Sequence, residues 1–95
     1  MSLAPVRVDR SVELLKALAD PTRLQMMATL KRASEPVCIC DFTASFELTQ
    51  PTISHHMAKL KEAGLVEVSK VGIWAHYRLN RQLDARTRTL LDAVV

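Results

Sequence analysis

The stretch TQPTISHHMAKLKEAGLVE, residues 49–67, indicates the fold most directly. Thr49 is a suitable N-cap, Pro51 is tolerated in the first turn of a helix, and Gly64 stands where a left-handed residue ends one. The apolar residues of the stretch recur at helical spacing on one side: Ile53, Met57 and Leu60. The other side is small and polar. We therefore predict a helix over residues 49–63 with a buried side and an exposed polar side.

Three shorter helices are predicted upstream. The first, over residues 10–19, has two apolar stripes, which are Val8, Val12, Leu15 and Ala19 on one side and Leu14 with Leu18 on another. A helix that is apolar on two sides is buried on two sides, so the second stripe indicates a neighbour such as a second copy of the chain. Asp20 caps the second helix, which runs to about Ala33. Asp41 is expected to cap the third, over residues 42–46.

The pattern changes after Gly64, where alternating apolar residues predict two strands, 65–70 and 73–79, around Val71-Gly72. A last helix from Gln82 carries one narrow apolar stripe: Leu83, Thr87, Leu90, Leu91 and Val94. The predicted order is four helices, two strands and a helix. This mainly α chain with a small antiparallel β-hairpin is typical of a winged helix-turn-helix, here one domain over residues 1–95.

Composition narrows the class of protein. The chain has 95 residues, of which 48% are hydrophobic and 24% charged, a balance typical of a single globular domain. Its net charge of +3 permits a nucleic-acid partner without requiring one. No apolar run approaches the roughly 20 residues that a bilayer needs, and the N-terminus lacks the apolar core of a secretion signal. We expect no membrane association and a cytoplasmic location.

The polar side of the 49–63 helix has side chains suited to duplex DNA. Gln50 can pair bidentately with adenine, Thr52 and Ser54 suit phosphates or base edges, and His55 lies near the middle of the outward arc. Lys59 can reach the DNA backbone, and Lys70 at the hairpin tip can follow phosphates beside a minor groove. The alternative is an ordinary solvated helix, but these polar residues have only middling helix propensity.

Four segments resemble the ArsR/SmtB family of bacterial winged helix-turn-helix, metal-responsive transcriptional repressors. They are LKALADPTRLQMMATL (15–30), VCICDF (37–42), LTQPTISHHMAKLKEAGLVE (48–67) and KVGIWAHYRL (70–79). The resemblance implies a homodimer held by the first and last helices, a palindromic operator, and release of DNA when a metal or metalloid binds. It assigns DNA reading to Gln50, Thr52, Ser54 and His55, the wing to Lys70 and Gly72, and packing to His56.

Cys38 and Cys40 match the CxC metal motif of that family. In an extended chain the two side chains would lie on one side, about 7 Å apart at Cα, whereas a regular helix would turn them apart. Chelation therefore requires an extended segment or a helix start. The chain has no third Cys, so two thiolates could hold Hg(II) or Cu(I). Trivalent arsenic would want a further ligand from Asp41, a buffer thiol or a partner subunit.

Two functions remain at this stage. The first is a sequence-specific repressor that binds a palindromic operator as a homodimer, needs no cofactor, and is released by a thiophilic ion at Cys38 and Cys40. The second is a metal-independent regulator with an unused CxC pair, controlled by a co-regulator protein. An enzyme is not expected, because the cysteines lack a paired base and the chain has no glycine-rich phosphate loop. His55, His56 and His76 are less favoured as metal ligands.

Overall fold

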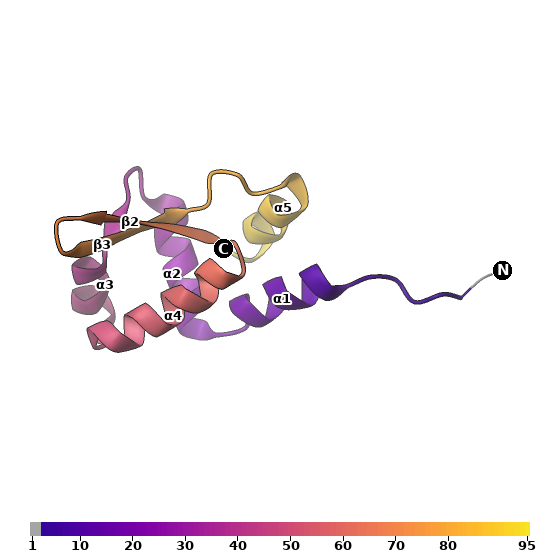
Figure 1. Ribbon diagram of the computed structural model, residues 1–95, viewed down its shortest axis with the longest axis horizontal. Helices are drawn as coiled ribbons and strands as arrows, with labels where there is room; N and C mark the ends of the chain where they lie inside the picture. Colours follow the sequence, from indigo (N-terminus) through magenta and orange to yellow (C-terminus); the bar gives the residue numbers. More distant parts are fainter. Residues whose placement is uncertain (1–2) are drawn as a thin grey trace.

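The computed structural model describes residues 3–95. Within that range the chain forms five helices and three short strands (Figure 1). Their bounds are α1 Asp9–Leu18, α2 Pro21–Arg32, β1 Val37–Cys38, α3 Ile39–Phe46, α4 Gln50–Glu62, β2 Val66–Val71, β3 Trp74–Leu79 and α5 Ala85–Val94. Among these described helices, none combines the length and apolarity needed to cross a bilayer.

Three helices begin at side-chain oxygens that accept a hydrogen bond from their own first turn. Asp20 accepts from the Arg23 amide at 3.0 Å, and Asp84 accepts from the Thr87 amide at 2.7 Å. Thr49 accepts from the Thr52 amide at 3.4 Å. These caps satisfy amides that have no partner inside the helix. They place the starts of α2 and α4 where the sequence predicts them.

The third helix starts earlier than predicted. Its N-cap is Cys38, whose sulfur lies 3.3 Å from the donating amide of Cys40, so the prediction that Asp41 caps the helix is wrong. Asp41 lies in the first turn instead. The reason is burial, because Ile39 and Phe42 are one helical turn apart and both are almost fully buried. Starting the helix at Ile39 puts both on its inner side.

The predicted hairpin forms, but a third strand extends it. β1 pairs with β3 antiparallel, with Val37 opposite Tyr77 and Cys38 opposite His76, which gives the strand order β1-β3-β2. The fold class predicted from the sequence stands, with β1 as a third strand beside the hairpin. The chain reverses at Gly72, whose φ of 63° is readily adopted by glycine.

The core lies between α4, the sheet and the first three helices. The predicted inner side of α4 is buried: Ile53, Met57 and Leu60. It packs in one cluster with Met26, Met27 and Phe42 among others. Between α3 and α4 the chain turns at Glu47, a non-glycine residue with φ 53°. The two helices of the predicted helix-turn-helix are therefore held by a shared core.

Helices α1 and α5 lie at the end of the molecule opposite the β2–β3 turn (Figure 1). The inner stripe of α1 is buried as predicted, whereas Val8, Val12 and Leu15 on its other side are 51%, 41% and 53% exposed. A groove between α1 and α5 is lined by residues of both helices, including Leu15 and Leu90. An apolar surface thus spans the two helices that the resemblance assigns to a dimer interface.

Candidate nucleic-acid interface

The outer side of α4 presents its polar residues to solvent, as the periodicity predicts. Gln50 and His55 are exposed, and Thr52 and Ser54 are half-buried at the edges of that side. The first turn of α4 carries a polar arrangement of its own. The Thr49 hydroxyl donates to the Thr52 hydroxyl oxygen at 2.9 Å, so the Thr52 hydroxyl keeps its own hydrogen for an outside acceptor. A phosphate oxygen is such an acceptor, and the helix N-terminus favours its negative charge.

Ser54 is half-buried on the side of α4 that approaches the sheet. Burial raises the pKa of the Tyr77 phenol on β3, and a side-chain hydrogen bond with Ser54 acts against that increase. The Ser54 hydroxyl therefore lies near the Tyr77 phenol. Its assignment to base reading stays a prediction, while its contact with Tyr77 ties the middle of α4 to β3.

Beneath α4, Arg23 joins three helices. Its Nε donates to the Ala17 carbonyl of α1 at 2.6 Å, and its Nη1 lies 3.2 Å from Nδ1 of His56 on α4. His56 has a side-chain exposure of only 17%, which confirms the prediction that it packs at the flank of the helix. The amide of Arg23 and then its charge hold the pKa of Asp20 below its ordinary value. Sequence analysis missed Arg23, although its place three residues after a capping Asp was a signal.

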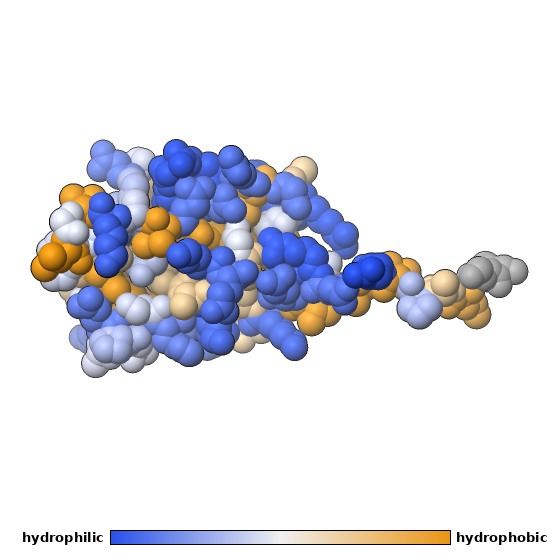
Figure 2. All heavy atoms as spheres, in the orientation of Figure 1, coloured by the Kyte–Doolittle hydropathy of each residue, from blue (hydrophilic) through white to orange (hydrophobic). Residues whose placement is uncertain are grey.

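The remaining basic positions differ in their surroundings. Lys59 is exposed and shares a groove between α1 and α4 with Glu13, Lys16 and Glu62, a surface of mixed charge. Lys70 is exposed near the end of β2. The tip beyond it is apolar, because Val71 is 62% and Ile73 is 83% exposed, in keeping with the hydrophobic spheres at that end in Figure 2.

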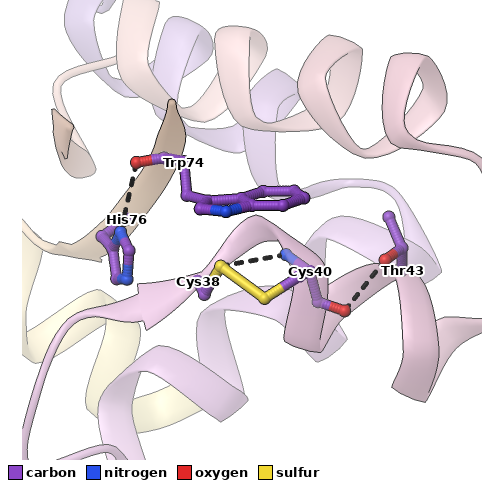
Figure 3. The surroundings of a disulfide bond; sticks show 5 residues. All are labelled: Cys38, Cys40, Thr43, Trp74 and His76. Atoms are coloured by element: carbon purple, nitrogen blue, oxygen red, sulfur yellow. Dashed lines mark hydrogen bonds between the residues drawn. A yellow bond between two sulfur atoms is a disulfide. The ribbon is translucent and has the colours of Figure 1, made fainter. Parts of the chain in front are cut away.

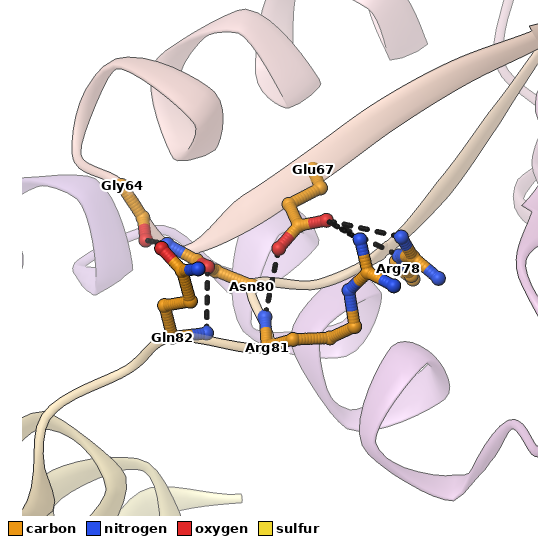
Figure 4. A network of polar contacts seen from close by, with 6 residues as sticks. All are labelled: Gly64, Glu67, Arg78, Asn80, Arg81 and Gln82. Carbon is orange, nitrogen blue, oxygen red and sulfur yellow. Dashed lines mark hydrogen bonds and ion pairs between the residues drawn. The ribbon is translucent and has the colours of Figure 1, made fainter.

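The base of the hairpin is fixed to the end of α4 by a polar network (Figure 4). Glu67 accepts from the Arg81 amide at 2.8 Å and pairs with the Arg78 guanidinium at 3.2 Å. The Arg81 amide and then the two arginine charges lower the pKa of Glu67. Asn80 donates to the Gly64 carbonyl at 2.8 Å. The wing is thus oriented relative to α4 by side chains that the sequence analysis did not single out.

The CxC pair lies at the junction of β1 and α3. Cys38 is buried and Cys40 is exposed, and their sulfurs are joined as a disulfide. Their Cα atoms are 5.2 Å apart, less than the expected 7 Å, because one residue ends a strand and the other begins a helix. The helix-start alternative is the one that the structure adopts. The indole of Trp74 lies over the pair, and the ring of His76 lies beside Cys38 (Figure 3).

No complete metal site is assembled at these cysteines. Across residues 3–95, no three side chains of His, Cys, Asp or Glu are grouped so as to hold a metal ion. A thiophilic ion prefers soft ligands such as these two sulfurs, which lie close together. The pair nevertheless provides only two ligands. Any further ligand must be brought to the pair.

Comparison with known proteins identifies the class of protein to which the chain belongs. The family model described as bacterial regulatory protein, arsR family, matches residues 20–68, from the cap of α2 through α3 and α4 into β2. The chain belongs to the arsR family. It is therefore a DNA-binding transcriptional regulator, and the match includes the whole α3–α4 unit and the CxC pair.

Two curated ArsR-family relatives and one solved structure illustrate the likeness. The arsenical resistance operon repressor of Escherichia coli is 40% identical over 85% of this chain and 68% of its own length. An arsenic resistance transcriptional regulator of Pseudomonas putida is 40% identical over 84% of this chain, which spans only 62% of that protein. A homodimeric winged helix-turn-helix DNA-binding domain from Mycobacterium bovis superposes with a TM-score of 0.77 at 24% identity, over 99% of this chain and 86% of its own. The winged helix-turn-helix fold is thereby confirmed.

Proposed function

We propose that this ArsR-family chain is a repressor that binds a palindromic operator as a homodimer and leaves it when a thiophilic metal or metalloid ion binds Cys38 and Cys40. The position of the cysteines carries the proposal, because they form the cap and first turn of α3. Helix α3 packs directly on α4, whose outer side holds Gln50, Thr52 and His55. An ion that pulls on the first turn of α3 thus acts on the helix-turn-helix itself.

A second route joins the cysteines to α4 through the sheet. Cys38 follows Val37, which lies opposite Tyr77 on β3, and Tyr77 interacts with Ser54 in the middle of α4. A shift of β1 on ion binding would therefore reach α4 from the sheet as well as from α3. Couplings of this kind are typically worth about 1–3 kcal/mol, enough to change operator occupancy about 5- to 150-fold.

The apolar stripe on α1 supports the homodimer. Val8, Val12 and Leu15 are exposed on a helix whose other side is buried, and the groove to α5 continues that surface. A twofold axis through this end would relate two copies of α4 and two wings by symmetry. Two related half-sites then explain a palindromic operator, in which Gln50, Thr52, Ser54 and His55 meet base edges and phosphates, and Lys59 and Lys70 meet the backbone. Such a repressor would act in the cytoplasm, where bacterial operators lie.

The test uses a duplex selected by the protein from random-sequence DNA. Operator binding of the reduced protein is followed by fluorescence anisotropy while Cd(II), Hg(II) or As(III) is added. We expect at least one ion to release the wild-type protein, and the double variant Cys38→Ser with Cys40→Ser to bind the operator normally but resist release. If no ion weakens wild-type binding, or if the double variant still responds, the effector assignment is wrong and regulation by a co-regulator protein gains support.

A further inference from the structure

The third ligand that the cysteine pair lacks has a candidate on the neighbouring strand. Cys38 and His76 are directly opposite each other in the β1–β3 register. Side chains at such positions lie on the same face of a sheet, with Cβ atoms about 4.5–5.5 Å apart. Figure 3 shows the imidazole beside Cys38 accordingly. Three residues able to bind a soft ion therefore lie in the neighbourhood of the β1–β3 pair, although 36 or more positions separate His76 from the cysteines in the sequence.

The hydrogen bonding of His76 leaves its Nε2 atom available to bind an ion. Its Nδ1 lies 3.3 Å from the carbonyl oxygen of Trp74, an acceptor, so the ring donates through Nδ1 and its lone pair is on Nε2. Metal-binding histidines characteristically donate their second nitrogen to a carboxylate or a backbone carbonyl in this way, which fixes the ring and the tautomer. This contact is a second observation, independent of the strand register.

We propose that the reduced side chains of Cys38 and Cys40, together with Nε2 of His76, form a three-ligand site for a divalent thiophilic ion such as Cd(II) or Zn(II), beneath the indole of Trp74. The inference rests on the proposed effector role of the cysteines and adds the histidine and the class of ion. The structure contains the closed, oxidised form. A thiol reductant opens it by supplying two electrons and two protons to the disulfide, and ion binding then releases the thiol protons to solvent.

The local charges suit this ion class. Helix α3 begins at the site, and its N-terminus stabilises negative charge on the two sulfurs, one of which accepts from the Cys40 amide. Two thiolates and an imidazole are a ligand set that Zn(II) and Cd(II) accept, with water in a fourth position. Trivalent arsenic prefers soft sulfur ligands throughout. Side-chain rotations at Cys40 and His76 are required, because the three groups are not gathered around one point in the oxidised form.

The experiment titrates the reduced, full-length protein with CdCl2 without DNA and without a thiol buffer. Binding is read from the thiolate-to-cadmium absorption, the fluorescence of Trp74, and the ¹¹³Cd NMR shift, which responds to a nitrogen ligand. We expect one Cd(II) per protomer in the wild type. His76→Asn keeps a donor for the Trp74 carbonyl but removes the ligand, and it should lower Cd(II) affinity at least about tenfold, since even outer partners of metal ligands have effects of that size. His55→Ala is the matched control and should bind Cd(II) as the wild type does.

The outcomes separate this inference from the function on which it rests. If His76→Asn and His76→Gln bind Cd(II) with wild-type affinity and an unchanged ¹¹³Cd shift, His76 is not a ligand, whereas the cysteine assignment stands. If Asp41→Asn lowers affinity and the His76 variants do not, the third ligand is Asp41 and the proposal is overturned. If the double cysteine-to-serine variant binds Cd(II) like the wild type, the effector site itself is wrong. Circular dichroism establishes that each variant is folded.

Discussion

Gln50 is the exposed polar residue at the first position of α4, where a side chain reaches outward from the helix end. Replacing it with alanine should cost about 1–3 kcal/mol of operator binding, because a bidentate contact with adenine would be lost. Binding to unrelated duplexes should change little. Anisotropy titrations with the selected operator and a scrambled duplex measure both. Equal losses on the two duplexes would show that Gln50 does not read sequence.

Lys59 is exposed, but it shares its groove with Glu13 and Glu62. If it contacts phosphate, Lys59→Ala should reduce the slope of log affinity against log salt by about 0.9 for each protomer. Lys31→Ala removes a lysine that pairs with Asp92 at 2.9 Å on another face and is the matched control. If both variants have the same slope, Lys59 does not contact phosphate and belongs only to the α1–α4 surface.

For individual residues, the sequence predicted exposure or burial where this depends only on the position of the residue on one helix. His55 is exposed, as the 100° spacing requires, whereas the exposure of Gln50 and the packing of His56 agree with what the family resemblance implies. The partners of Arg23 and His76 could not be predicted, because each contacts an element far away in the chain. Ser54 was placed at the boundary of the helix correctly, but its interaction with Tyr77 depends on where the sheet lies.

Helix α2 depends on a charged cap whose strength varies with pH. The pKa of Asp20 is below its ordinary value of 3.8, so its charge stabilises the folded state above that pH, and the stabilisation disappears as the pH falls through the lower folded value. Asp20→Asn keeps an acceptor but loses the charge, and it should lower the free energy of unfolding by about 0.3–1 kcal/mol at pH 7.

The difference between Asp20→Asn and the wild type should shrink in urea titrations as the pH falls below 3.8. A difference that stays constant from pH 7 to pH 3 would show that the charge of Asp20 has no role in the stability of α2.

At the level of elements, the capped helices and the hairpin strands were predictable, whereas the pairing of the short strand β1 with β3 was not. Asp20 and Thr49 are residue types that favour N-cap positions, and α2 and α4 begin directly after them. β1 has only two residues and no period of its own, and it exists because β3 offers an unpaired edge. The early start of α3 follows from burial of Ile39 and Phe42, which outweighed the capping tendency of Asp41.

The whole molecule separates its exposed apolar residues into two ends, α1 at one and the wing tip at the other. Leu15→Glu places a charge on the exposed stripe of α1 without touching the buried one, so it should give a folded monomer. Leu90 is a less clean site, because it is half-buried against the core. Sedimentation should show monomers, and operator affinity should fall roughly 10²- to 10⁴-fold as the second half-site contact is lost.

Val71→Glu is the matched control for the association state. It introduces the same charge at an apolar residue with 62% exposure, but at the wing end. It should remain dimeric in sedimentation. If Leu15→Glu stays dimeric and Val71→Glu becomes monomeric, copies of the chain associate through the wing rather than through α1.

A hydrogen bond joins α1, which we propose lies at the dimer interface, to α4, which we propose contacts the DNA. Arg10 of α1 donates to the Ala63 carbonyl at 2.6 Å, at the C-terminal end of α4, and its guanidinium lies 3.3 Å from where a Cβ of Gly64 would stand. If the dimer forms through α1, a tilt of one protomer against the other would be passed to α4 through this hydrogen bond. It would then change the distance and the angle between the two α4 helices on the duplex.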